Sequence, residues 1–348
     1  MNDKTVDKPQ VLQFVVLAQI VGCLLVIFGH SYPFVTDVPK FLTDIRTFVY
    51  CFHMPLFIWC SGFLFVYTRQ LDKRTFGQFT KVRAKRLLIP YLVLSVIGLL
   101  PKILFSEYLN DSLALEPLPI IRSFLVPREN VWGHFWFLPM IFFIGLIGYA
   151  LEKVRQNLKV NKQITGWTLT AVLFALSFVR LDFGEWFGLN DVIKYTFVYV
   201  LGMTLADTYG IIEKTGRNVF IIIGILSFIF SVIIFVLIRS EGGVIADLKS
   251  KIISVLMIVS VVCLCKACET VKVSKNSLIA QTYTIFILSW PFQLIAEILL
   301  ERVLGLGYYI VMPSMFIAGV VLPVLTIWLI DKIEKNYDKK IISFILGR

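Results

Sequence analysis

The stretch LQFVVLAQIVGCLLVIFGHSYP, residues 12–33, contains no lysine, arginine, aspartate or glutamate. A helix needs about 20 consecutive apolar residues to cross the hydrocarbon core of a bilayer, and this stretch is long enough. It follows a short polar segment, residues 1–10, which carries Lys4 and Lys8. Because no small-residue cleavage pattern follows the apolar run, we interpret it as a retained first transmembrane helix rather than a signal peptide.

Further apolar segments of the same kind follow along the chain. We predict ten transmembrane helices, near residues 12–33, 46–67, 87–106, 132–151, 165–181, 191–207, 218–238, 250–268, 277–298 and 310–330. The segments lack the alternating pattern of barrel strands, so the predicted fold is an all-α, polytopic membrane helical bundle. Prolines in and beside residues 102–131 mark this region as an irregular connection rather than a span.

Composition supports a single integral-membrane domain over residues 1–348. Hydrophobic residues make up 57% of the chain and charged residues 16%, and the mean hydropathy is +0.80. A soluble domain has about 25% charged residues, so a soluble core could not bury this much apolar surface. The polar stretches are too short to form a core of their own, and we predict no separate soluble domain.

Lysine and arginine residues predict the orientation of the chain. With the N-terminus inside, 23 of the 34 basic residues fall in connections that face the cytoplasm. Both termini, including a tail at residues 331–348, are therefore predicted to be cytoplasmic, in a multi-pass protein of the plasma or inner membrane. The net charge of +11 is explained by contact with the anionic inner leaflet, and without a soluble basic module we expect no nucleic-acid partner.

Three of the six cysteines, Cys263, Cys265 and Cys268, cluster near the end of one apolar segment. Such a cluster can bind a metal ion, but a zinc site would need a second pair of cysteines or histidines nearby. We interpret these cysteines as small apolar residues at a helix end and expect no metal site.

The three histidines of the chain fall in the outer half of the predicted bundle. His30 ends the first span, His53 lies about 10 Å into the second, and His134 starts the fourth. Titratable side chains in a membrane are costly and indicate a functional site by default. Structural interpretations stay open: His30 can cap a helix end, His53 can satisfy carbonyls freed at a proline kink, and His134 can belong to an aromatic interface.

A basic cluster, KVRAKR at residues 81–86, opens the third span on its cytoplasmic side. Arg83 and Arg86 are three residues apart and so share one face of a helix. Anchoring at the cytoplasmic interface is one explanation of such residues. A paired guanidinium clamp for phosphate groups is the alternative, because arginine can bind phosphate through two parallel hydrogen bonds.

Short motifs that contain these histidines and arginines occur in a fixed order along the chain. They are Leu24–Ser31 (LLVIFGHS), Phe52–Phe57 (FHMPLF) with Ser61–Phe63 (SGF), Arg83–Tyr91 (RAKRLLIPY) and Trp136–Leu138 (WFL). In this order and spacing they resemble the signature of the acyltransferase 3 family of integral-membrane acyltransferases. We expect the similarity to extend over the whole chain.

Members of that family transfer acyl groups, usually acetyl, to hydroxyls of surface glycans, lipids or small molecules, and they have about ten spans. The resemblance implies that His30 is the catalytic histidine and that Arg83 and Arg86 bind the donor, acetyl-CoA. We also assign His53 to the catalytic site, where it orients groups or stabilises charge. Acetyl-CoA is a substrate, and no bound cofactor is expected. The candidate supporting residues are Ser31, His134, Trp136 and Ser289.

Two positions depart from the pattern of the family. Gln19 stands eleven residues before His30, where family members usually have lysine or arginine. Ser289 stands within YTIFILSWP, residues 283–291, where family members often have histidine. Both departures bear on the choice of substrate.

The predicted topology and the resemblance agree in direction. The donor is cytoplasmic and the arginine pair faces the cytoplasm, whereas the histidines lie toward the outside, where surface glycans are built. We therefore expect a membrane O-acyltransferase in which His30 either deprotonates an acceptor hydroxyl or carries the acyl group covalently. The expected partners are acyl-CoA, a glycan or lipid-linked sugar acceptor and membrane lipid.

Two other classes of function stay open. A glycan or lipid transporter or flippase would need buried charge pairs or broken helices at the bilayer midplane, and the middles of most predicted spans contain no charge. A non-catalytic scaffold or receptor would have no need for His30 together with Arg83 and Arg86.

Overall fold

Every regular element in the described part of the chain is a helix. The computed structural model describes residues 12–33, 37–104, 117–158, 160–238, 242–274, 277–337 and 340–348. The predicted polar N-terminal segment, residues 1–10, lies outside the described residues, as does part of the irregular connection predicted at 102–131.

The helices follow one another with short connections. In chain order they are α1 (Gln13–His30), α2 (Lys40–Tyr50), α3 (His53–Tyr67), α4 (Gln70–Lys73), α5 (Phe76–Leu104), α6 (Pro117–Leu125), η2 (Pro127–Glu129), η3 (Gly133–Trp136), α7 (Phe137–Asn157), α8 (Lys162–Leu176), η4 (Trp186–Gly188), α9 (Leu189–Ala206), α10 (Tyr209–Lys214), α11 (Arg217–Leu237), α12 (Gly243–Ala267), η5 (Leu278–Ala280), α13 (Thr282–Glu297), η6 (Ile298–Val303), α14 (Tyr308–Tyr337) and α15 (Ile341–Ile345).

Within the described ranges, seven helical stretches are long and apolar enough to cross a membrane. They are Gln13–His30, Lys40–Tyr67, Gly133–Asn157, Arg217–Leu237, Gly243–Ala267, Thr282–Val303 and Tyr308–Asn336. Each coincides with a predicted span, which confirms the all-α, polytopic membrane fold.

The other three predicted spans are helices with weaker membrane character. α8 has 15 residues and rises only about 22 Å. α5 contains the basic cluster of residues 81–86, and α9 carries Asp191 and Lys194 in its first two turns. Ten crossings, and the cytoplasmic position of both termini, therefore stay predictions.

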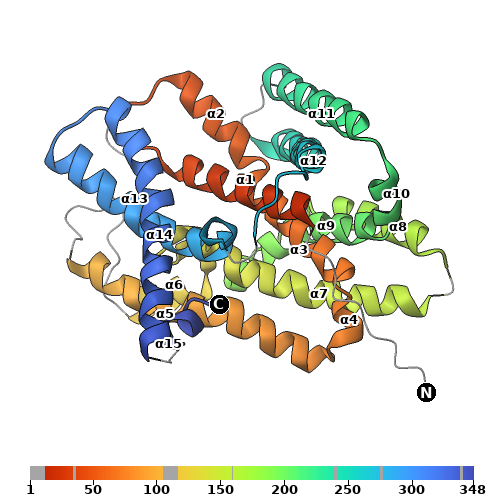
Figure 1. Cartoon of the computed structure of the whole chain (residues 1–348), viewed down its shortest axis with the longest axis horizontal. Coiled ribbons are helices and arrows are strands. Elements are labelled where there is room, and N and C mark those ends of the chain that lie inside the picture. Colours follow the sequence, from red (N-terminus) through yellow and green to blue (C-terminus); the bar gives the residue numbers. More distant parts are fainter. Residues whose placement is uncertain are drawn as a thin grey trace.

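Helix α3 lies at the centre of the bundle, among α1, α7 and α9 (Figure 1). Two glycines let α3 and α9 approach closely. A Cβ atom on Gly62 of α3 would collide with the backbone carbonyl of Tyr199, and one on Gly202 of α9 would collide with the carbonyl of Trp59. Small residues at a crossing are a common way to pack helices in a membrane, because they bring the two backbones together.

The predicted second span, 46–67, is divided at Cys51–Phe52 into α2 and α3. Pro55 does not kink a continuous helix, because it lies in the first turn of α3, where its missing N–H would have no helical partner. His53 is therefore the first residue of α3 rather than a residue two turns inside a span.

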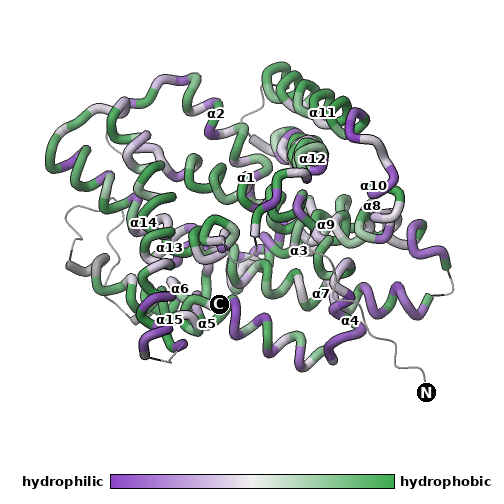
Figure 2. Tube along the Cα trace, in the orientation of Figure 1, coloured by the Kyte–Doolittle hydropathy of each residue, from purple (hydrophilic) through white to green (hydrophobic). Residues whose placement is uncertain are grey.

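Helices α11 and α12 pair at one edge of the molecule (Figure 1). α11 is apolar along almost its whole length (Figure 2), and its outward side chains include Phe228, Phe230 and Leu237. A helix that stays apolar on its outer face is suited to lipid contact.

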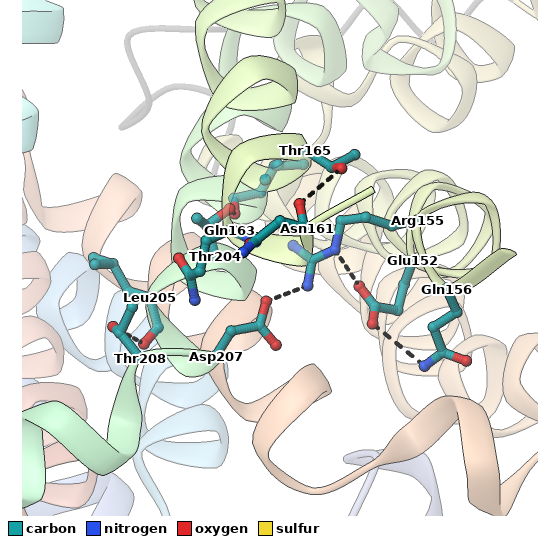
Figure 3. Close-up of polar contacts among 12 residues, drawn as sticks. Glu152, Arg155, Gln156, Asn161, Gln163, Thr165, Thr204, Leu205, Asp207 and Thr208 are labelled. Carbon is teal, nitrogen blue, oxygen red and sulfur yellow. Dashed lines mark hydrogen bonds and ion pairs between the residues drawn. The ribbon is translucent and has the colours of Figure 1, made fainter. Parts of the chain in front are cut away.

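A buried ion-pair cluster joins the ends of α7 and α9 (Figure 3). Arg155, which is 1% exposed, pairs with Glu152 at 3.1 Å on its own helix and with Asp207 at the end of α9. Gln156 adds a hydrogen bond of 3.3 Å to Glu152. Arg155 therefore connects α7 and α9 through ion pairs. It is also one of the basic residues in the predicted cytoplasmic connections that predict the orientation of the chain.

Candidate active site

Two histidines that lie far apart in the sequence come together in space. His30 is the last residue of α1, and His134 lies in η3, just before α7. Their ring centroids are 6.2 Å apart, and the Trp290 ring on α13 lies 5.1 Å from His30 and 6.2 Å from His134. His134 makes no well-formed side-chain hydrogen bond with the described residues, although the Ile287 backbone lies within reach of a weaker one. A buried ring with spare hydrogen-bonding capacity calls for an explanation.

Tyr50 connects the third histidine to this pair. Its ring centroid lies 4.9 Å from that of His53 and 5.9 Å from that of His30. The Nδ1 atom of His53 is 2.8 Å from the Val49 carbonyl, so Nδ1 donates and Nε2 is the basic nitrogen of the neutral ring. Tyr50 is 38% exposed, so the three-histidine cluster of His30, His53 and His134 approaches the surface here.

Side chains from other helices satisfy the carbonyl groups at the end of α1. The Nε2 atom of Gln293, on α13, donates 2.8 Å hydrogen bonds to the Ile27 carbonyl and to the hydroxyl of Ser31. Ser31 in turn donates to the Ile27 carbonyl at 2.7 Å. Because the last carbonyls of a helix lack helical partners, these bonds fix the end of α1 on which His30 sits.

Helix α2 holds the same end of α1 from another direction. Nε of Arg46 and the hydroxyl of Tyr50 each donate a 3.1 Å hydrogen bond to the Gly29 carbonyl. The Arg46 guanidinium also lies over the rings of Tyr32 and Tyr50, at 5.0 and 5.2 Å from their centroids. The end of α1 that carries the catalytic candidate His30 is thus held by two other helices, α13 and α2.

A cavity of about 900 Å³ runs along α3 from Met54, beside His53, to Thr68 at the other end of the helix. This distance is about 20 Å at the helical rise. Five cationic side chains line the cavity, and no acidic side chain does among the described residues. The cationic residues are Arg74, Arg83, Lys85, Arg86 and Arg348. Such a site favours an anionic ligand.

The two predicted donor-binding arginines line this one cavity but reach toward different helices. The Arg83 guanidinium packs against Gly145 of α7, where any side chain would collide with it, and Nη2 donates to the Ile141 carbonyl at 2.6 Å. Arg86 lies over the ring of Tyr283 on α13, 5.3 Å from its centroid. The pair therefore spans the cavity instead of forming one tight clamp.

A layer of phenylalanine rings separates the cavity from the histidines. Phe57, Phe137 and Phe286 line the cavity, with centroid distances of 6.4 Å between the first two and 5.9 Å between the last two. Phe286 also lies 5.4 Å from His134. This phenylalanine layer thus stands between the basic cavity and His134 of the three-histidine cluster.

Two of the predicted supporting residues lie apart from this cluster. Trp136 lies under the Arg128 guanidinium, 4.2 Å from the ring centroid, and Arg128 forms a two-pronged ion pair with Asp191. Ser289 is buried and donates to the Phe286 carbonyl at 3.0 Å. Gln19, by contrast, lines the basic cavity, which gives this departure from the family pattern a direct place in the site.

Sequence reasoning missed Tyr50, Arg46, Trp290 and Gln293. Trp290 and Gln293 lie on α13, and Gln293 follows its partner Ile27 by 266 residues. Nothing in the spacing of the sequence connects these two residues to His30. Trp290 does follow Ser289 in the motif YTIFILSWP, residues 283–291, and this motif is the one signal in the sequence that pointed to this part of α13.

Comparison with known proteins agrees with the motifs. A family model described as "Acyltransferase domain" matches residues 13–332. The chain is 26% identical over 194 residues to "Glucans biosynthesis protein C" of Escherichia coli (strain SMS-3-5 / SECEC), covering 54% of this chain and 48% of that protein. It is 27% identical over 192 residues to "Nodulation protein NolL" of Mesorhizobium japonicum, covering 53% and 45%.

The match therefore spans about half the length of each of these relatives. No solved structure matches the chain significantly.

Proposed function

Because the chain belongs to the acyltransferase family whose domain covers residues 13–332, we propose that it is an O-acyltransferase of the cell membrane. In this proposal it transfers acetyl from acetyl-CoA to a hydroxyl of a cell-surface glycan. The observation that carries the proposal is the pairing of a basic cavity with a three-histidine cluster across one layer of phenylalanine rings.

The cavity suits the donor in size and charge. Acetyl-CoA carries several phosphates at one end and the thioester at the end of a long, thin arm. The phosphates would lie among Arg83, Arg86 and Lys85, and the arm would follow α3 toward Met54 and the phenylalanine layer. Arginine binds phosphate through charge-assisted hydrogen bonds, which are stronger than neutral ones.

His30 performs the proton transfer in this mechanism. Its neutral imidazole accepts the proton of the acceptor hydroxyl as the oxygen attacks the thioester carbon, and the thiolate of coenzyme A leaves and takes up a proton. One C–O bond forms and one C–S bond breaks. The other route has His30 attack the thioester first, so that the acetyl group passes through the imidazole to the hydroxyl.

The glycan acceptor is supported by two features. One relative of the chain is named as a glucans biosynthesis protein. The three-histidine cluster also approaches the surface at Tyr50, on the opposite side of the phenylalanine layer from the cavity. An acceptor could therefore reach His30 without passing through the donor cavity.

The test incubates membranes that contain the wild type, His30→Ala or Lys153→Ala with acetyl-CoA labelled in its acetyl group. Lys153 is exposed at the end of α7 and serves as the control. We expect alkali-labile label on the glycan fraction with the wild type and Lys153→Ala, and none with His30→Ala at equal protein abundance. Equal labelling by His30→Ala would contradict the proposal, and movement of unmodified glycan without labelling would favour a transporter.

A further inference from the structure

The segment Lys340–Arg348 lies beyond the family-matched residues 13–332 and yet helps to form the basic cavity. It contains α15, which packs beside α5 and the end of α14 (Figure 1). Phe344, Gly347 and Arg348 line the cavity together with the arginines of α5. This wall of the cavity therefore lies outside the residues that the family model matches.

Two acidic residues on α14 anchor the segment. Glu334 accepts hydrogen bonds from the backbone N–H of Ser343, at 2.7 Å, and from its hydroxyl. Asp331, one turn earlier, pairs with Nη2 of Arg348 at 2.7 Å. The two anchors hold the segment at Ser343, within α15, and at Arg348.

The backbone also fits closely at Gly347. Its φ angle is +71°, a left-handed conformation that glycine adopts without strain. A Cβ atom here would collide with the backbone carbonyl of Arg86. The segment is thus packed directly against the donor-binding part of α5, and Leu346 beside it is buried.

Arg348 differs from the other cavity cations in how it is held. Arg83 is hydrogen-bonded to a carbonyl of α7, whereas Arg348 is held through Asp331, whose side chain is 43% exposed and does not line the cavity. An ion pair with a partly exposed carboxylate is weak, so a phosphate group can compete for the guanidinium.

We propose that residues 340–348 form one wall of the donor site and that Arg348 leaves Asp331 to bind a phosphate of the donor. The ligand is a phosphate-rich nucleotide thioester, and the inference rests on the proposed function. It adds a binding residue from outside the family-matched region, on a segment that packs beside Lys85 and Arg86 of α5.

The experiment uses the full chain, purified in detergent, with acetyl-CoA as donor and coenzyme A as the binding probe. Three variants are compared: Arg348→Ala, Asp331→Asn and the control Lys335→Ala, whose side chain is exposed on α14 and does not line the cavity. We expect Arg348→Ala to raise KM for acetyl-CoA and Kd for coenzyme A about tenfold, the loss of one charge-assisted hydrogen bond, with kcat little changed.

Asp331→Asn separates a binding role from a structural one. If Arg348 binds a phosphate of the donor, the Asp331 carboxylate competes with that phosphate for the guanidinium. Its removal in Asp331→Asn then lowers KM for acetyl-CoA. If Asp331→Asn instead raises KM as much as Arg348→Ala does, Arg348 only anchors the segment, and the proposal is wrong. An unchanged KM and Kd with Arg348→Ala would also overturn it. If the wild type binds no coenzyme A, the proposed donor itself fails, which is a separate result.

Discussion

The end of α1 shows how single residues can position the histidine that we propose to be catalytic. His30 lies in the last turn of α1, whose carbonyl groups have no donors within the helix. Gln293, Arg46 and Tyr50 donate hydrogen bonds to these carbonyls from two other helices. These contacts fix the backbone of His30 and leave its ring against Tyr50, His134 and Trp290.

Gln293→Leu is expected to lower kcat about tenfold and to leave KM for acetyl-CoA unchanged, because Gln293 holds His30 and does not line the donor cavity. The variant also leaves the Ile27 carbonyl with one donor fewer, at a cost of about 1–2 kcal/mol in the free energy of unfolding. Steady-state kinetics and thermal unfolding measure the two effects. Thr326→Ala, which removes a hydroxyl on the exposed side of α14, is the control. A changed KM with full kcat would show that Gln293 acts on the donor instead.

His134→Phe tests whether the second ring is chemical or only structural. Phenylalanine preserves the ring packing on Phe286 and Trp290 and removes two buried nitrogens that lack well-formed hydrogen bonds. Thermal stability should therefore stay equal or rise, since an unsatisfied buried polar group is costly. We expect acyl transfer to fall at least about tenfold, the scale of a lost acid–base or charge-stabilising group. Full activity would assign His134 to packing alone.

At the scale of the helix, the fold depends on how closely α3 and α9 approach. Gly62→Ala and Gly202→Ala each place a methyl group against a backbone carbonyl of the other helix. A backbone carbonyl cannot move aside unless its whole helix shifts. We expect each to destabilise the protein by about 1–3 kcal/mol or more and to lower its abundance in the membrane. Gly77→Ala on α5, where a Cβ atom would have open space, should have no such effect. Equal abundance of all three variants would show that this crossing is not needed.

The helices themselves could be read from the sequence wherever an apolar run was bounded by charge. The break at Cys51–Phe52 could not, because the apolar run continues through it and the turn is set by tertiary contacts such as that of Tyr50 with Gly29. His30 and the arginines stood out by their chemistry. Gln293 did not, because its partner Ile27 lies 266 residues away. Arg348 did not, because the cavity that it lines is formed with α5, a helix far away in the sequence.

At the scale of the whole molecule, the opening of the basic cavity and the three-histidine cluster lie toward opposite ends of the bundle. The cavity is basic and opens beside α4 and α5, whose connection is predicted to be cytoplasmic, whereas the three-histidine cluster lies at the opposite end of α3. The proposed reaction needs this arrangement, because donor and acceptor occupy different compartments.

The native cysteines can test the orientation. Cys268 is exposed at the predicted cytoplasmic end of α12, and Cys51 lies at the α2–α3 break on the predicted outer side. A membrane-impermeant maleimide should label Cys268 in inverted vesicles but not in intact cells, and Cys268→Ser identifies the labelled position. Labelling of Cys268 in intact cells would show that this part of the bundle has the opposite orientation to the predicted one.

The most direct test of the central claim separates the two substrates by the bilayer. Proteoliposomes enclose acetyl-CoA labelled in its acetyl group, and the glycan acceptor is added only outside. We predict labelled glycan outside with the wild type and none with His30→Ala, since the acetyl group must pass from the basic cavity to the three-histidine cluster. Labelling only when both substrates share one compartment, or equal labelling by His30→Ala, would contradict it.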